Sequence, residues 1–283
     1  RRVLFRSYFM DVKQVWAVYF SGTGTTEKVV TSIAAFTAEH LHVPNETLDF
    51  TLPAARTLNY QFSSDDLVIF GTPVIAGRVP NVLLPFLNGH FQAEQSMAVP
   101  VVLYGNRNFD DALIELREIL EGNGFRTIAG GAFIGEHSFS KSLAAGRPDA
   151  SDLKEAAAFS GKIAEKVTGL NELPSEPVFV RGQLPLSPYY TPRDRNGVHI
   201  NILKVKPKTS EKCTHCGLCA DVCPMGSISK EDVTRYNGIC IKCCACVKKC
   251  PVGAKYYDDE GYLYHQHELE DLYTRRAEPE LFL

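Results

Sequence analysis

The segment Val15-Trp16-Ala17-Val18-Tyr19-Phe20-Ser21-Gly22-Thr23-Gly24-Thr25-Thr26 joins a short apolar run to a turn of glycine and hydroxyl residues. Apart from Ala17, the residues at 15–20 are β-branched or aromatic, which predicts a strand buried inside a parallel sheet. A helical pattern of about 13 residues starts at Glu27. A buried strand, a glycine-rich turn and a helix in this order indicate an open α/β sheet.

The first 170 residues continue this alternation. Further strands are predicted at 46–50, 67–70, 99–104 and 127–134. Further helices are predicted at 82–87, 109–121 and 151–167, the last of them capped by Ser151 or Asp152. Strands that alternate with helices imply right-handed crossovers, and therefore a five-stranded parallel sheet with helices on both faces.

The turn at 21–26 is a candidate anion site, because free backbone N–H groups and the helix dipole converge where a helix begins. A dinucleotide fingerprint would place a third glycine where Glu27 stands, although Asp49 near the end of the second strand keeps that alternative open. The turn lacks the lysine of a nucleoside triphosphate loop. Its hydroxyl groups suit a terminal phosphate monoester, and a turn without a ligand is the third alternative.

Two further segments give this part of the chain a resemblance to a flavodoxin. Residues 71–78 (Gly-Thr-Pro-Val-Ile-Ala-Gly-Arg) follow the third strand, and residues 104–109 (Tyr-Gly-Asn-Arg-Asn-Phe) follow the fourth. In flavodoxins these positions hold the loops that cover the ring of FMN, and the first turn binds its phosphate. The resemblance therefore implies FMN at the carboxyl ends of the strands. It assigns to FMN the residues Ser21, Gly22, Thr23, Gly24, Thr25, Thr26, Thr72, Pro73, Val74, Ile75, Gly77, Tyr104, Gly105, Asn106 and Phe109.

Two of these residues depart from the flavodoxin pattern. Asn106 stands where many flavodoxins have Asp, and Phe109 stands where they have Tyr. We expect Asn106 to remove an anion near the flavin and so to ease formation of the anionic hydroquinone. Phe109 has ordinary core packing as its alternative role. His137 follows the fifth strand and is a candidate to hydrogen-bond or protonate the flavin, with a capping or surface role as the alternative.

All nine cysteines lie between Cys213 and Cys250, in an internal repeat with a period of 27 residues. The sequence CTHCGLCADVCP at 213–224 matches CIKCCACVKKCP at 240–251. Each copy reads C-x2-C-x2-C-x3-C-P, which is typical of bacterial ferredoxins with two [4Fe-4S] clusters. In that motif the fourth cysteine of each copy binds the other cluster. The predicted ligands are Cys213, Cys216, Cys219 and Cys250 for cluster one, and Cys240, Cys243, Cys246 and Cys223 for cluster two.

The alternatives for the repeat are two zinc sites or four disulfides. Zinc usually takes paired C-x2-C knuckles, and C-x2-C-x2-C would leave one ligand redundant. Clusters bound by four cysteines each leave no open iron, which favours electron transfer over Lewis-acid chemistry. Cys244 lies outside the pattern and is predicted to be a small buried residue beside cluster two. His215 is predicted to face solvent or to tune a potential rather than to bind iron.

The chain is predicted to divide into a flavodoxin-like FMN-binding domain at 10–170, a proline-rich linker at 171–200, a small α+β two-[4Fe-4S] ferredoxin-like domain at 201–264 and a helical tail at 265–283. The linker is expected to pack along the surface. The tail holds a helix candidate at 267–276. Residues 1–9 precede Met10 and are interpreted as an extension outside the fold.

A flavodoxin-like part followed by a two-cluster ferredoxin-like part resembles the fused flavodoxin–ferredoxin proteins of anaerobic bacteria and archaea. The resemblance implies an electron-transfer protein that links two [4Fe-4S] clusters to FMN and converts between one- and two-electron transfers. Its partners would be other redox proteins. The alternative is a flavin-dependent reductase of a small acceptor, such as a quinone, a nitro compound or an organic substrate. The sequence leaves open which of the two applies.

Composition narrows the class of protein further. The 283 residues carry 30 Lys and Arg against 33 Asp and Glu, and this formal net charge of −3 argues against a nucleic-acid partner. The sequence lacks the roughly 18 consecutive apolar residues of a membrane span. It also lacks the apolar core of a secretion signal. We therefore expect a cytoplasmic protein, where thiols stay reduced and favour metal binding. A homodimer is left open.

Overall fold

The structure is a computed structural model that describes residues 12–283. The extension proposed for residues 1–9 and the predicted domain start at residue 10 lie outside the described residues.

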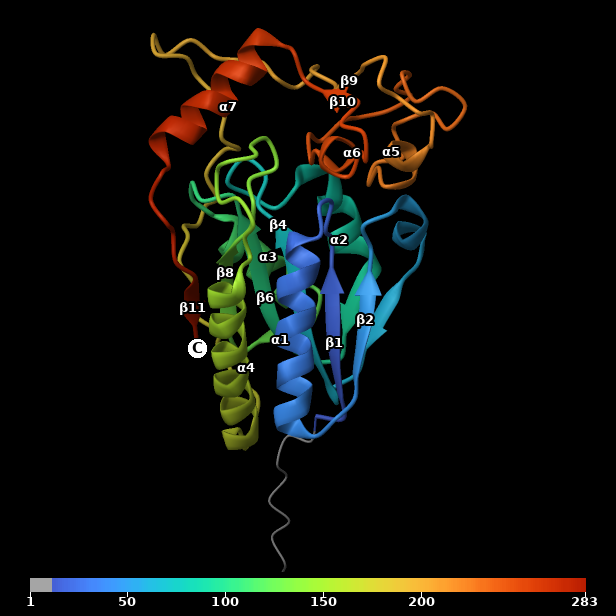
Figure 1. The fold of residues 1–283 in the computed structure, drawn as a ribbon. Coiled ribbons are helices and arrows are strands. Elements are labelled where there is room, and N and C mark those ends of the chain that lie inside the picture. Colours follow the sequence, from blue (N-terminus) through green and yellow to red (C-terminus); the bar gives the residue numbers. More distant parts are fainter. Residues whose placement is uncertain (1–11) are drawn as a thin grey trace, which may run out of the picture.

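A largely parallel sheet forms the body of the molecule (Figure 1). Its strands follow the spatial order β11-β8-β6-β4-β1-β2, and the short β7 (Arg126–Thr127) pairs with β6. The five long strands are β1 (Gln14–Tyr19), β2 (Asn45–Asp49), β4 (Asp66–Pro73), β6 (Met97–Tyr104) and β8 (Gly130–Ile134). Counted along the chain, their order is 2-1-3-4-5, which is the flavodoxin-like order. The predicted fold class is thereby confirmed.

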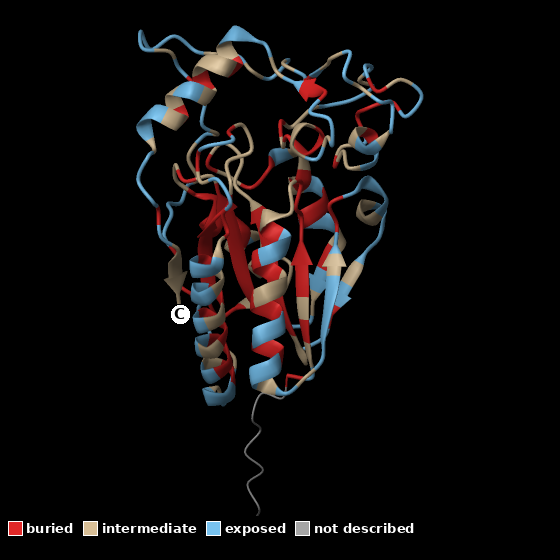
Figure 2. Cartoon of the chain, in the orientation of Figure 1, coloured by how far each residue is buried: buried red, intermediate tan, exposed pale blue. Residues whose placement is uncertain are grey.

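Helices cover both faces of this sheet. The helices α1 (Thr25–Leu41) and α4 (Ala150–Gly169) lie together on one face, and α2 (Leu84–His90) and α3 (Ala112–Gly122) lie on the other (Figure 1). The alternation of side chains along β1 explains the two cores. Ala17 packs into the cluster formed with α1 and α4, whereas Val18 packs into the cluster formed with α3. The central strands are buried on both faces (Figure 2).

Three local features differ from the sequence predictions. The strand predicted at 127–134 is interrupted, because only its ends pair with β6 as β7 and β8. A second small sheet pairs β3 (Tyr60–Phe62) with β5 (Phe91–Ala93). Neither strand was predicted, because the sequence shows no clear alternation of apolar and polar residues there. The short 3-10 helices η1 (Pro53–Thr57) and η2 (Asn81–Leu83) precede β3 and α2.

The fourth helix is capped by a residue other than those predicted. Asp149 is the N-cap, and its carboxylate accepts hydrogen bonds from the backbone N–H groups of Ser151 and Asp152. The carboxylate of Asp152 accepts in return from the Asp149 N–H at 2.9 Å. The prediction of Ser151 or Asp152 as the cap was wrong, because this reciprocal capping box starts the helix at Ala150.

The proline-rich linker lies along the sheet-bearing part without forming a named helix or strand. Backbone N–H groups of Gln183 and Ser187 donate to the carboxylate of Asp111 at 3.1 and 2.8 Å. The phenol of Tyr189 donates to the carbonyl of Val79 at 2.8 Å. The linker therefore has fixed partners on the flavodoxin-like part.

The cysteine repeat folds around two short helices, α5 (Leu218–Asp221) and α6 (Ala245–Lys248), beside the antiparallel pair β9 (Lys208–Thr209) and β10 (Lys255–Tyr256). The 27-residue period is visible in the backbone. Three pairs of equivalent residues have positive φ, namely His215 with Lys242, Gly217 with Cys244, and Gly226 with Gly253. The two copies of the repeat thus adopt the same turns.

The tail differs from the helix predicted at 267–276. Helix α7 (Glu260–Leu272) begins earlier, where Asp259 caps it by accepting from the Tyr262 N–H. The chain then returns to the main sheet as β11 (Glu280–Phe282), which pairs antiparallel with β8 (Figure 1). The tail is therefore helical only in its first part.

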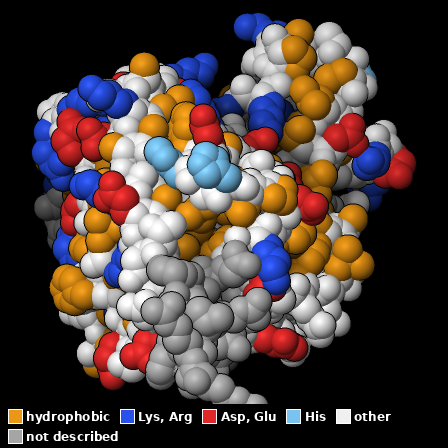
Figure 3. All heavy atoms as spheres, turned by 90° about the horizontal axis from the view of Figure 1, so that it is seen from below, with side chains coloured by type: hydrophobic (Ala, Val, Ile, Leu, Met, Phe, Trp, Pro, Cys, Tyr) orange, Lys and Arg blue, Asp and Glu red, His pale blue; other side chains and the backbone are white. Residues whose placement is uncertain are grey.

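No helix among residues 12–283 is long and apolar enough to cross a membrane. Figure 3 shows the end of the molecule opposite the cysteine repeat, where acidic and basic side chains are interspersed. The visible part of this end carries no large field of one sign, in keeping with the small net charge.

Candidate cofactor and cluster sites

A cavity of about 850 Å³ opens at the carboxyl ends of β1, β4, β6 and β8. Open α/β sheets bind their ligands at this edge, and the volume is in the range of small-molecule sites. Ten of the fifteen residues assigned to FMN line it: Gly22, Thr23, Thr25, Thr26, Pro73, Val74, Ile75, Gly77, Tyr104 and Gly105. The structure thus brings the three predicted loops to one space.

The glycine–hydroxyl turn is held in shape by its own serine. The hydroxyl of Ser21 accepts from the N–H groups of Gly24 and Glu27, each at 3.1 Å. The Ser21 side chain is therefore used inside the turn and does not line the cavity, and neither does Gly24, whose positive φ of 97° forms the turn. The hydroxyl-bearing residues Thr23, Thr25 and Thr26 do line it.

This donor set fits a phosphate monoester. The 17-residue helix α1 directs its N-terminus at the cavity, and threonine side chains stand beside its free N–H groups. In the part of the chain that the structure describes, only two Lys or Arg side chains line the cavity, Arg107 and Lys242, and neither belongs to the turn. Flavodoxin-type binding of FMN, in which hydroxyl and N–H groups replace cations, would use this arrangement.

Asn106 lies elsewhere than expected. Its side chain is buried, and its amide N–H₂ donates to the carbonyls of Tyr273 and Arg275 at 2.7 and 2.6 Å. Its amide oxygen accepts from the Ala277 N–H at 3.1 Å. The side chain therefore fastens the tail after α7 and does not line the cavity. The sequence pattern could not reveal this role, because the partners lie about 170 residues further along the chain.

Phe109 and Thr72 also lie outside the cavity lining. Phe109 is fully buried against Tyr104, with ring centroids 5.6 Å apart, and the guanidinium of Arg181 lies 4.0 Å from its ring centroid. These contacts match the core-packing alternative for this residue. Thr72 is buried within β4, and its hydroxyl has no hydrogen-bond partner among the described residues.

The linker supplies cavity residues that the sequence analysis missed. Tyr189 and Tyr190 line the cavity, and the Tyr190 N–H donates to the carbonyl of Ala76 in the loop after β4 at 2.9 Å. The guanidinium of Arg107 lies 4.7 Å from the ring centroid of Tyr190. The pair of aromatic residues in a proline-rich segment was the only available signal.

Three histidines line the cavity, His137, His199 and His265, and burial keeps the rings of His137 and His265 uncharged. Burial lowers the pKa of His137 to about 4, with help from nearby positive charges. The Nδ1 of His137 accepts from the Phe139 N–H at 3.2 Å, so the neutral ring carries its proton on Nε2. Burial likewise lowers the pKa of His265 on α7 to about 4. A Cβ placed on Gly105 would lie 2.3 Å from the ring of His137, so this position requires glycine.

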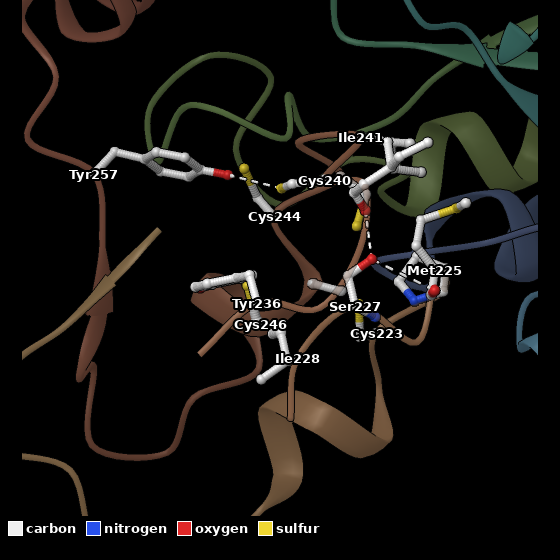
Figure 4. A pocket seen from close by; sticks show the side chains of 14 residues that line it. Cys223, Met225, Ser227, Ile228, Tyr236, Cys240, Ile241, Cys244, Cys246 and Tyr257 are labelled. Carbon is white, nitrogen blue, oxygen red and sulfur yellow. Dashed lines mark hydrogen bonds between the residues drawn. The ribbon is translucent and has the colours of Figure 1, made fainter. Parts of the chain in front are cut away.

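The four residues predicted to bind cluster two surround one small cavity (Figure 4). They are Cys223, Cys240, Cys243 and Cys246. Cys223 comes from the first copy of the repeat and the other three come from the second, as the ferredoxin motif requires. All nine cysteines are free thiols, which contradicts the disulfide alternative. Within residues 12–283, no three His, Cys, Asp or Glu side chains are grouped to hold one metal ion.

The residues predicted for cluster one lie at the more exposed end of the repeat. Cys216 is exposed, and Cys213, Cys219 and Cys250 are partly buried. Cys213 and Cys219 pack with Cys223 and Cys246 around a small apolar core. Backbone N–H groups donate to sulfur at equivalent places in the two copies, from Ser227 to Cys223 at 3.3 Å and from Ala254 to Cys250 at 3.2 Å.

Cys244 is buried, as predicted, beside the residues that are predicted to bind cluster two. Its thiol donates to the carbonyl of Lys242 at 3.4 Å and lies 3.5 Å from the phenol oxygen of Tyr262. Burial raises the pKa of the Cys244 thiol to about 11. At neutral pH it is therefore a packed thiol without charge. His215 is exposed, as predicted.

The two cofactor regions are in direct contact. A Cβ placed on Gly22 of the glycine–hydroxyl turn would lie 3.1 Å from the Cβ of Cys243 and 3.4 Å from its Sγ. The segment from Ile239 to Cys243 also lines the large cavity. Cluster two would thus stand at the wall of the proposed FMN site, and cluster one would stand further away.

Two cationic side chains, Lys248 and Arg56, connect the ferredoxin-like part to the flavodoxin-like part. Lys248 on α6 forms an ion pair with Glu136 and donates to the carbonyls of His137 and Ser140 at 2.8 and 2.9 Å. Arg56 in η1 donates to the carbonyl of Pro224, the residue after Cys223. Both contacts lie one or two residues from a predicted ligand of cluster two. The ferredoxin-like part is therefore docked rather than merely tethered.

Residues 207–229 match the family model of the 4Fe-4S binding domain. Comparison with curated proteins finds no match. Among solved structures, the chain is similar to a flavodoxin from the domain Archaea, with 16% identity, a TM-score of 0.41, and coverage of 54% of this chain and 98% of the other. A flavodoxin from Streptococcus pneumoniae TIGR4 shows 15% identity, a TM-score of 0.39, and coverage of 54% and 99%. Rubredoxin oxygen:oxidoreductase from the anaerobe Desulfovibrio gigas shows 16% identity, a TM-score of 0.41, and coverage of 56% and 37%.

These structural likenesses are too distant to assign a function. The chain therefore joins a 4Fe-4S binding segment, shown by the family match, to a sheet whose strand order is flavodoxin-like.

Proposed function

We propose that this chain is an electron-transfer protein that links two [4Fe-4S] clusters to one FMN. The observation that carries the proposal is the contact between Gly22 of the glycine–hydroxyl turn and Cys243, a predicted ligand of cluster two. Electron tunnelling weakens steeply with distance, so a shared wall favours direct exchange between the two sites. No second chain is needed to bring them together.

The exposure of the cysteines suggests an order for the centres. Cys216 of cluster one is exposed, whereas Cys246 of cluster two is buried. An external redox protein would therefore exchange electrons at cluster one, and cluster two would relay them to or from the cavity. Flavin accepts electrons singly or in pairs, whereas each cluster passes one at a time. The chain would thus convert between one- and two-electron transfers, in the cytoplasm of an anaerobic cell.

The chain's own residues would position FMN in defined ways. The N–H groups at the start of α1, with Thr23, Thr25 and Thr26, would hold the phosphate. The loops at 73–77 and 104–105 would flank the ring. The Nε2–H of His137 would be available as a hydrogen-bond donor at the same edge of the sheet.

Anaerobic purification with measurement of iron, sulfide and flavin tests this proposal. We expect about eight irons and one FMN per chain, and two interacting cluster signals on reduction, as two four-iron cubes require. Photoreduction of the clusters should be followed by flavin reduction whose rate does not depend on protein concentration. A chain that holds four irons or fewer after reconstitution, or a flavin rate that scales with concentration, would contradict the proposal.

The alternative function is a flavin-dependent reductase of a small acceptor. One observation favours it over a pure carrier: residues of the linker and of α7 line the cavity in addition to the residues assigned to FMN. Both functions use the same electron path. They differ in what receives the electrons at the flavin.

A further inference from the structure

The large cavity has a wall that the proposed FMN residues do not explain. We call it the outer wall, and it consists of His137, Phe139, Tyr190, His265 and Leu269. Its rings form a series: the centroids of His137 and Phe139 are 5.3 Å apart, those of Phe139 and His265 are 6.2 Å apart, and those of His265 and Tyr190 are 5.9 Å apart. Tyr190 belongs to the linker, and His265 and Leu269 belong to α7.

His265 is the main sign that this wall faces a ligand. Only 4% of the residue is exposed, and its buried Nδ1 has no hydrogen-bond partner among the described residues. The nearest carboxylate oxygen, on Glu268, lies 3.8 Å away, which is too far for a hydrogen bond. Buried polar atoms rarely remain without a partner. The imidazole of His265 therefore has a polar atom whose hydrogen-bonding capacity residues 12–283 leave unused.

His137 offers a second donor at the other side of Phe139. Its Nδ1 is occupied by the Phe139 N–H, which leaves the Nε2–H without a partner among residues 12–283. Because burial lowers the pKa of both histidines to about 4, both rings are uncharged at neutral pH. The outer wall thus presents two neutral imidazoles separated by a phenyl ring.

The cations at the cavity are already engaged. Arg107 is paired with Asp110 and lies over the ring of Tyr190. Lys242 donates to the carbonyls of Leu203 and Cys240 at 2.6 and 3.1 Å. Among residues 12–283, no other Lys or Arg lines the cavity. A second phosphate-bearing ligand, such as a pyridine nucleotide, would therefore find no free cation here.

We propose that the outer wall is a binding site for a small, flat, uncharged electron acceptor of the quinone class. Quinones carry carbonyl oxygens at opposite sides of a ring, which matches two imidazole donors on either side of Phe139. The flat rings of Tyr190 and Phe139 supply stacking surface. This inference rests on the proposed function, because it places the acceptor beside FMN.

The chemistry of such an acceptor is compatible with the electron path. Conversion of a quinone to its hydroquinone takes up two electrons and two protons. The electrons come from a reduced redox protein that docks at cluster one, and the protons come from water. Two successive one-electron deliveries through cluster two therefore balance the reduction of one quinone.

The test measures binding of menadione (2-methyl-1,4-naphthoquinone) to the oxidised full-length protein, whose FMN and iron contents are determined first. We expect saturable binding of one menadione per chain. His265→Leu removes the unpartnered imidazole and should weaken binding about tenfold, the value of one hydrogen bond with its ring contact. His267→Leu is the matched control on the same helix, because His267 is exposed and outside the cavity. Tyr190→Leu provides a second test on the linker, independent of the folding of α7.

The outcomes separate this inference from the proposed function. Weaker binding in His265→Leu and Tyr190→Leu, with FMN and iron unchanged and His267→Leu like the wild type, supports both. Menadione binding that is absent, or equal in all three variants, overturns the quinone site while the electron-transfer proposal stands. A full-length protein that takes up iron but no FMN overturns both proposals together.

Discussion

The side-chain amide of Asn106 holds the backbone of Ala277, whose N–H donates to the Asn106 Oδ1 at 3.1 Å. Asn106 has a positive φ of 66° and stands near the start of the loop after β6, whereas Ala277 lies between α7 and β11. With the two carbonyls that accept from its N–H₂ group, Asn106 uses all of its amide to fasten the tail. These three hydrogen bonds give the Asn106 side chain a structural role.

Asn106→Asp should destabilise the protein. A carboxylate would lose both N–H donors and place a negative charge against the carbonyls of Tyr273 and Arg275, at a cost of about 1–3 kcal/mol. Denaturant unfolding of the holo-protein measures this cost. Asn108→Asp is the control, because both hydrogen bonds of the Asn108 side chain are accepted by its oxygen, and a carboxylate oxygen can accept them too. Equal stability of the two variants would refute the assignment, and a flavin potential that falls in Asn106→Asp would revive the flavin-tuning role expected from the sequence.

Lys248→Met should loosen the docking of the ferredoxin-like part. The change removes an ion pair and two hydrogen bonds to carbonyls of the loop at 136–140, worth about 1–3 kcal/mol. We expect slower transfer from clusters to flavin with cluster potentials unchanged, measured by photoreduction. Lys249→Met is the control, since the neighbouring Lys249 is exposed. If both variants transfer electrons at the wild-type rate, the contacts of Lys248 do not affect electron transfer and this prediction is wrong.

Stability should fall as the pH is lowered from about 6.5 towards 4. Burial keeps the pKa of His265 at about 4 in the folded chain, against 6.5 when unfolded, so in this window the unfolded state binds more protons. Folding is therefore favoured above pH 6.5, and that advantage is lost as the pH approaches 4. Thermal unfolding of wild type and His265→Leu at pH 7 and pH 5 measures the effect. The variant should lose less stability than the wild type or His267→Leu; an identical pH dependence in all three proteins would count against a buried neutral His265.

Cys223→Ser and Cys244→Ser should differ in iron content, because Cys223 is a predicted cluster ligand and Cys244 is not. Cys223 is a predicted ligand of cluster two, so in Cys223→Ser the iron should fall towards about four per chain while the signal of the proposed cluster one persists. Cys244→Ser should keep about eight irons, because Cys244 lies outside the ligand pattern and its thiol is hydrogen-bonded to protein groups, namely the Lys242 carbonyl and the Tyr262 phenol. Iron analysis and EPR of the reduced proteins make the comparison. Loss of iron in Cys244→Ser equal to that in Cys223→Ser would reverse the assignment.

The parts of the structure that local sequence controls were predictable. The buried run at 15–20 and the turn after it define β1 and the start of α1, because burial on both faces and glycine turns leave a local pattern. The cysteine spacing likewise brought Cys223 to the ligands of the second copy. In each case the chemistry requires a fixed residue type at a fixed distance along the chain.

The parts formed by distant segments were not predictable in this way. Asn106 fits a flavodoxin loop by position, but its partners lie in the tail. Tyr190 reaches the cavity because the linker is fastened to Asp111 and Ala76, contacts that leave no periodic signal. His265 preceded the charged helix predicted at 267–276, and only the docking of α7 reveals its burial. Side-chain identity alone does not encode which remote surface a segment will cover.

The pairing of β11 with β8 changes how the chain should be divided. The chain leaves the sheet-bearing part after α4, forms the cysteine repeat, and returns to the sheet at Glu280. The iron–sulfur part is therefore inserted within one folded unit and is not attached at its end. Cleavage in the linker would therefore leave the two fragments bound to each other through the sheet. We therefore expect that neither the flavodoxin-like part nor the ferredoxin-like part can be removed without disturbing the other.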